Sequence, residues 1–168
     1  MMSRCTTFAR SLITTGALLG SIALTAIPAA PALAGIDDPF QVLYIFPGAR
    51  DNGGAAGAGV ATVIHCFSFS STSEILQYTV RDFNGTLKAN LTQGIASLGT
   101  ETATTHDNVV YFTNLALNTG VIGQGTIGVS ATSTNIVCTG QVMDASASVP
   151  NGVDLHAVRF NPISGSAE

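Results

Sequence analysis

The stretch Leu76–Thr92, LQYTVRDFNGTLKANLT, decides the fold class of this chain. It contains two runs, 76–81 and 86–92, in which apolar and polar residues alternate, and a side-chain period of two is typical of a strand with one buried face. The dipeptide Asn84-Gly85 lies between the runs and favours a tight hairpin turn in which both residues adopt a positive φ. The stretch therefore predicts a β-hairpin.

The chain beyond residue 40 repeats this pattern of short apolar runs. Gly, Asn, Ser, Thr and Pro separate the runs, and no amphipathic window longer than two helical turns occurs. About eight short strands predict an all-β domain over residues 41–162, a single antiparallel β-sandwich of about 7–9 strands. Residues 35–40 are predicted to be a flexible N-terminal segment and residues 163–168 a C-terminal tail. Further strands are predicted at 41–46, 60–69, 109–114, 124–132, 135–143 and 153–160.

The composition narrows the class of protein. The chain has 168 residues, a formal net charge of −4 and 10% charged residues, compared with about 25% in an ordinary globular domain. Six Lys and Arg residues against ten Asp and Glu residues exclude a nucleic-acid binder, because such a protein needs a clustered basic surface. The length fits one domain.

The first 34 residues have the three parts of a secretory signal peptide. Two Arg residues precede an apolar run, Leu12–Ile27, and Ala-Leu-Ala at 32–34 supplies a small-residue cleavage site, so we expect cleavage between Ala34 and Gly35. The apolar run has about 16 residues, fewer than the ~20 of a membrane span, so we expect no stable membrane anchor after cleavage. The short basic start and Ala-rich end are typical of bacteria, which predicts a protein secreted to the periplasm or outside the cell.

Two cysteines remain after cleavage, Cys66 and Cys138. In an oxidising compartment an even pair favours a disulfide, and two free thiols are the alternative. The bond would close a loop of about 73 residues and stabilise the fold by about 4 kcal/mol in the chain-entropy model.

The placement of the cysteines, one in the predicted second strand and one in the second-to-last, resembles an immunoglobulin-like domain over residues 40–160. The resemblance implies a Greek key in which the Cys66–Cys138 disulfide joins one sheet to the other through the core. The chain departs from that family because it has no Trp, and because Ile136 occupies the place where a corner Tyr is expected.

Two phenylalanines do not fit a sheet with one apolar face. If Cys66 faces the core, Phe67 and Phe69 face away from it. We expect the segment 94–108 to cover them or a β-bulge to change their facing. The alternative is that Phe67 and Phe69 form an interaction surface for another molecule.

Sequence motifs for catalysis and cofactors are weak. Gly123–Gly128 matches G-x-G-x-x-G, but it lies within a predicted strand, where it cannot start a phosphate-binding helix. His106 with Asp107, and His156, are the residues that could form a loose metal site, and the alternative is that their side chains are solvated or hydrogen-bonded. We therefore predict no catalytic residues, no cofactor and no metal site.

These observations favour a secreted or cell-surface protein without enzymatic activity. We expect a structural or interaction role, in which the domain binds a protein partner or a second copy of itself. The alternative is a small exported enzyme, or a metal- or ligand-binding protein, that uses loop residues around His106, Asp107 and His156.

Overall fold

The computed structural model describes residues 39–160, and this part of the chain is all β. The signal segment with its expected cleavage site at Ala34 and Gly35 lies outside the described residues, as does the tail 163–168. The described strands are β1 (Gln41–Asp51), β2 (Val60–Ser68), β3 (Glu74–Asp82), β4 (Leu87–Ile95), β5 (Thr100–Thr104), β6 (Leu115–Ala116), β7 (Ile122–Ala131), β8 (Ile136–Asp144), β9 (Gly152–Leu155) and β10 (Val158–Arg159).

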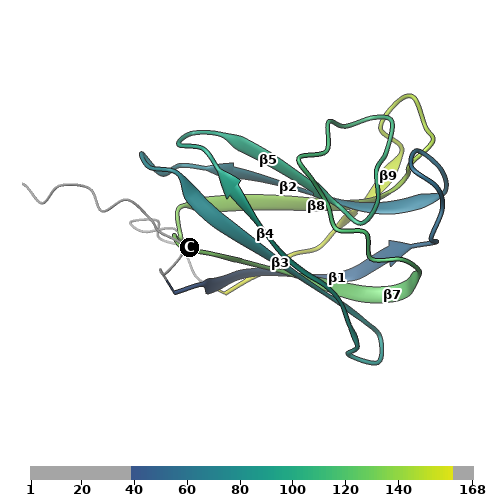
Figure 1. The fold of residues 1–168 in the computed structure, drawn as a ribbon, viewed down its shortest axis with the longest axis horizontal. Helices are drawn as coiled ribbons and strands as arrows, with labels where there is room; N and C mark the ends of the chain where they lie inside the picture. The colour runs from purple at the N-terminus through teal and green to yellow at the C-terminus, as the bar shows by residue number, and fades with distance from the viewer. Residues whose placement is uncertain (1–38, 161–168) are drawn as a thin grey trace, which may run out of the picture. The chain divides into compact units, whose positions relative to one another are not determined.

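The strands form two sheets that lie as two layers in Figure 1. The first sheet has the order β10-β1-β7-β3-β4, and the second has the order β6-β5-β2-β8-β9. Neighbouring strands run antiparallel, except that β6 runs parallel to β5. The Gly-rich motif 123–128 lies within β7, so it is part of a strand as the sequence predicted.

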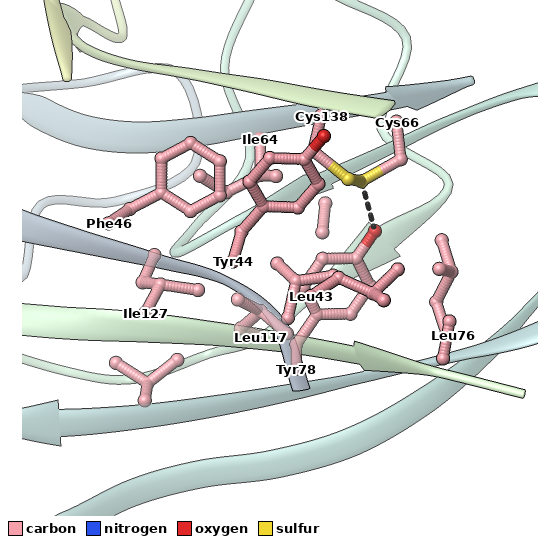
Figure 2. Close-up of a cluster of buried hydrophobic side chains, with 14 of the residues drawn as sticks. Leu43, Tyr44, Phe46, Ile64, Cys66, Leu76, Tyr78, Leu117, Ile127 and Cys138 are labelled. Atoms are coloured by element: carbon pink, nitrogen blue, oxygen red, sulfur yellow. Dashed lines mark hydrogen bonds between the residues drawn. A yellow bond between two sulfur atoms is a disulfide. The ribbon is translucent and has the colours of Figure 1, made fainter. Parts of the chain in front are cut away.

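Alternating side chains of both sheets contribute to one buried cluster (Figure 2). On β3 the predicted apolar face is confirmed, because Leu76, Tyr78 and Val80 are fully buried while the residues between them are partly exposed. Ile64 and Cys66 of β2 belong to the same cluster. The core is therefore built from the facing sides of the two sheets.

The predicted hairpin is confirmed as β3 and β4, but its turn differs from the expected one. Of the two central residues only Gly85 has a positive φ, 80°. The Gly85 N–H donates to the Asp82 carbonyl (2.9 Å), and the Asp82 carboxylate accepts from the backbone N–H of Asn84 and Thr86. The strand register shifts after Val80, so the hairpin ends in a longer turn with a bulge, stabilised by an Asp side chain.

The disulfide between Cys66 and Cys138 is present, but the prediction that it joins the two sheets was wrong. Strands β2 and β8 are neighbours in the second sheet, and the two cysteines face each other across them with their Cα atoms 4.1 Å apart. The chain crosses from the first sheet to the second between β7 and β8. Because β8 then pairs with β2, the two cysteines lie in the same sheet. A contact from the first sheet reaches the bond, because the Tyr78 hydroxyl lies 3.7 Å from Cys66 Sγ (Figure 2).

The strand predicted at 109–114 was also wrong, because this segment is a loop. The Asn108 side chain accepts hydrogen bonds from the backbone N–H groups of Val110 (3.0 Å) and Tyr111 (2.7 Å), which bends the chain into a turn. The strand in this region is β5, which the sequence did not predict because TETAT has no apolar alternation.

The last described strand, β10, returns from the second sheet to the first. It pairs with β1, and the Phe160 N–H donates to the Leu43 carbonyl (2.8 Å). The Arg159 guanidinium donates to the carbonyls of Ile136 and Thr134 at the start of β8 (2.9 Å each). Arg159 thus links the edge of the first sheet to the second.

Candidate interaction surface

The outer face of the second sheet, which points away from the shared core, is covered over only part of its length. The loop after β5 places the Tyr111 ring 4.5 Å from the His65 ring, in an edge-on contact. The Tyr111 hydroxyl also accepts a hydrogen bond from Gln141 Nε2 of β8 (2.9 Å). Val63, which lies two residues before His65 on the same face of β2, is fully buried. The loop therefore closes one end of the outer face.

The other end of this face is open and carries the two phenylalanines. Phe67 is half-buried and Phe69 is 53% exposed, and their rings form an edge-to-face pair with centroids 4.8 Å apart. Phe67 lies between Thr100 of β5 and Val137 of β8 in the strand register. We call Phe67, Phe69, Val137 and Thr100 the Phe67–Phe69 surface.

Both expectations for covering these rings were wrong. The segment 94–108 supplies β5, which lies beside β2 in the same sheet and so does not cross its outer face. The pairing of β2 with β5 and β8 is continuous, without a bulge that would change the facing. Phe67 is half-buried and Phe69 is exposed, and the alternative expectation, an interaction surface at these two residues, stays a prediction.

His65 marks the boundary between the covered and open ends. Its Nδ1 lies 3.0 Å from Thr102 Oγ1, and its Nε2 is buried without a hydrogen-bond partner among the described residues. Burial lowers the pKa of His65. The ring is therefore neutral at pH 7 and contributes packing under Tyr111.

The structure does not bring His106, Asp107 and His156 together. His106 is 8% exposed, whereas Asp107 and His156 are exposed. His106 Nδ1 lies 2.9 Å from Asp51 Oδ2, and Nε2 lies 2.9 Å from the Ala58 carbonyl oxygen. Among residues 39–160 no three His, Cys, Asp or Glu side chains form a group that could hold a metal ion.

Both ring nitrogens of His106 thus face hydrogen-bond acceptors. A carbonyl oxygen can only accept, and the Asp51 carboxylate also accepts from the Gly53 N–H (2.6 Å) and the Thr119 hydroxyl (3.2 Å). His106 and Asp51 therefore form a buried side-chain contact that joins the segment after β5 to the end of β1. Asp51 was not among the candidate site residues predicted from the sequence.

Glu101 is a buried carboxyl that sequence reasoning missed. It is 2% exposed, it accepts a hydrogen bond from the Tyr78 hydroxyl of the opposite sheet, and its Oε1 has no partner among the described residues. Burial raises the pKa of Glu101 to about 7, against a smaller lowering by the Tyr78 hydrogen bond. Burial, followed by the negative charge of Glu101, raises the pKa of Tyr78 well above its usual value.

Glu74, at the start of β3, is a second buried carboxyl, but its oxygens are well supplied with donors. Oε1 accepts from the hydroxyls of Ser70 (2.7 Å) and Thr72 (3.1 Å), and Oε2 accepts from Thr132 Oγ1 (2.7 Å). These bonds tie the loop before β3 to the end of β7. Glu74 therefore has a structural role.

The cavities near these groups are small. One of about 210 Å³ lies beside Asp51 and is lined by Val60, Val121 and Ile122, which is below the ~300 Å³ of a typical ligand site. A larger one of about 310 Å³ lies at the β3–β4 hairpin, beside Arg81 and Phe83. Neither contains one of the candidate histidines.

No protein-family model matches this sequence, and comparisons with curated proteins and with solved structures likewise found no similar protein. Within the described residues, no helix has the length and hydropathy needed to span a membrane.

Proposed function

We propose that the domain is a non-enzymatic interaction module of a secreted or cell-surface protein, and that it binds a protein through the Phe67–Phe69 surface. The observation that carries the proposal is the edge-to-face ring pair at the open end of this sheet face, with Phe69 53% exposed. Aromatic side chains supply large contact areas and are enriched at interfaces. Because β2 is central in its sheet, Phe67 stands on a rigid element, and Phe69 directly follows that strand, where its N–H donates to the Asn135 carbonyl (2.8 Å).

The chemistry of the buried polar groups supports this proposal over an exported enzyme. His106 and Asp51 bind each other, and Glu74 is surrounded by hydroxyl donors. Glu101 is enclosed in the core beside Tyr78. Each of these titratable groups is hydrogen-bonded inside the fold, which leaves none of them as a free acid or base.

The proposed fold is a β-sandwich related to the immunoglobulin-like Greek key, with its first and last main strands exchanged between sheets. The neighbours β2–β5 and β7–β3–β4 follow the immunoglobulin order, while β1 lies beside β7 and β8 lies beside β2. Export is supported by the signal-like start of the sequence and by the disulfide, since disulfides persist in oxidising compartments.

The test compares Phe69→Ser with Phe83→Ser, which removes a 75% exposed ring from the β3–β4 hairpin. Each protein is used as bait for affinity capture from the culture medium and envelope of the producing cells, and its melting temperature is measured. We expect that the wild type and Phe83→Ser capture a protein that Phe69→Ser does not capture. The melting temperature of Phe69→Ser should lie within a few degrees of the wild-type value. Unchanged capture by Phe69→Ser contradicts the proposal. A melting temperature of Phe69→Ser more than about 10 °C below the wild-type value also contradicts it, because this would place the ring in the core.

A further inference from the structure

The free edge of the first sheet is β4, and it differs from the other described sheet edges. Those edges are occupied by β10 and β6, with two residues each, and by β9, with four. β4 has nine residues, and β3 is its only strand neighbour among residues 39–160. Short edge strands protect a sheet from pairing with another chain, whereas a long edge presents a row of backbone donors and acceptors.

The side chains of β4 also leave apolar surface uncovered. Leu91 pairs with the buried Tyr78 and so faces the core side of the sheet, yet it is 39% exposed. Leu87 is 49% exposed. The core therefore covers β4 at Ile95 and leaves its apolar face exposed at Leu87 and Leu91.

A two-fold axis at Leu91 makes β4 complementary to a second copy of itself. Antiparallel pairing about this axis places Leu91 opposite Leu91 of the second copy, and Leu87 opposite Ile95. Lys88, which is the only charged residue of β4, comes opposite Gly94. A Cβ atom at Gly94 would meet nothing within 4 Å, so the long Lys88 side chain has space there. In this register the two exposed Leu91 side chains face each other and the two Lys88 charges are separated, while Ala89 comes opposite Gln93 and the Ile95 side chains stay in the core of each copy.

The geometry points to a symmetric dimer in which the β4 strands of two copies pair antiparallel about Leu91 and join their first sheets into one. Isologous two-fold contacts are the commonest form of self-association, because one surface serves both subunits. The backbone bonds hold the strands together, and the facing Leu91 side chains are withdrawn from water. A single strand pair buries less than a standard interface, so we expect a dissociation constant in about the micromolar range.

This dimer uses the opposite sheet from the Phe67–Phe69 surface and does not depend on the proposed function. Loss of partner capture in Phe69→Ser leaves it unchanged. Conversely, a monomeric protein would refute the dimer and leave the Phe67–Phe69 proposal standing. The two proposals can therefore fail separately.

The experiment uses the full chain with Cys5→Ser, produced under oxidising conditions so that the Cys66–Cys138 disulfide forms. Leu91→Cys is compared with Leu87→Cys, a matched change on the same strand. In the two-fold register residue 91 meets its own copy, whereas the two residues 87 lie at opposite ends of the pair. We expect mild oxidation to cross-link Leu91→Cys dimers at least about tenfold faster than Leu87→Cys dimers. Equal rates would overturn the proposal.

A second set of variants tests the same contact by charge. Leu91→Lys places two positive charges opposite each other and should weaken self-association in sedimentation equilibrium by about a hundredfold or more. Leu91→Glu should do the same, and an equal mixture of the two variants should associate again. Circular dichroism confirms that each variant is folded. Wild type that stays monomeric at 200 µM (about a hundred times the expected dissociation constant), or a mixture that does not associate, would overturn the dimer.

Discussion

Replacing Glu101 by Gln removes a titratable group from the core while it keeps an oxygen that can accept from Tyr78. The wild-type carboxyl is 2% exposed, and burial raises its pKa from 4.5 to about 7. Because the folded-state pKa lies above the unfolded value, folding favours the neutral carboxyl. The stability that this adds is fully present below about pH 4.5 and is lost as the pH rises through 7.

The magnitude follows from the pKa shift. A shift from 4.5 to about 7 corresponds to about 3 kcal/mol, at 1.36 kcal/mol for each pKa unit. The free energy of unfolding of the wild type should therefore fall by about 3 kcal/mol more than that of Glu101→Gln between pH 4 and pH 8. The lowered pKa of His65 affects both proteins equally and cancels in the comparison.

Urea unfolding, followed by circular dichroism at half-unit pH intervals, measures this difference. Asp154→Asn is the control, because its carboxyl is exposed, and it should keep the wild-type pH profile. Glu101→Gln lowers stability at acid pH, since the buried amide lacks a second partner, but its profile should be flatter. Parallel profiles for wild type and Glu101→Gln would refute the reasoning, because they would mean that Glu101 ionises with little cost in the folded core.

Two further substitutions test the loops. His106→Leu leaves the buried Asp51 carboxylate without the His106 hydrogen bond and should lower the free energy of unfolding by about 1 to 3 kcal/mol, whereas His156→Leu, at an exposed site, should change it by less than about 0.5 kcal/mol. Equal effects in urea unfolding would contradict a structural role for the His106–Asp51 contact. Gly85→Ala should cost about 1 kcal/mol because its φ is 80°, and Gly94→Ala, which has open space, should be near neutral. A neutral Gly85→Ala would show that the turn tolerates a side chain.

The sequence predicts the local β-structure of this chain well. Alternation in 76–81 and 86–92 identifies β3 and β4, because one buried face imposes a period of two. Counting cysteines also predicts the Cys66–Cys138 bond. These features depend on neighbouring residues or on a choice between very few partners.

The errors concern how distant segments are arranged. Local alternation does not encode that β8 crosses to the sheet of β2, so the disulfide was assigned between sheets. In 109–114 the Tyr111 ring contacts the sheet from outside, while Val109 and Phe112 are exposed, and the sequence does not distinguish this loop from a strand. For the candidate site, alternation predicts that Phe67 faces away from the core, but the exposure of Phe69 depends on the packing of distant segments, which local alternation does not encode.

The pairing of β10 with β1 determines how the domain would respond to mechanical force. Tension applied at residues 39 and 160 would act directly on these two strands, and the bond from Phe160 to Leu43 lies at their common end. The hydrogen bonds between β1 and β10 would break one at a time from this end, so we expect a low force to start the unfolding of the domain. The extended length of the unfolded chain would be limited, because the segment between Cys66 and Cys138 cannot extend while the disulfide is intact.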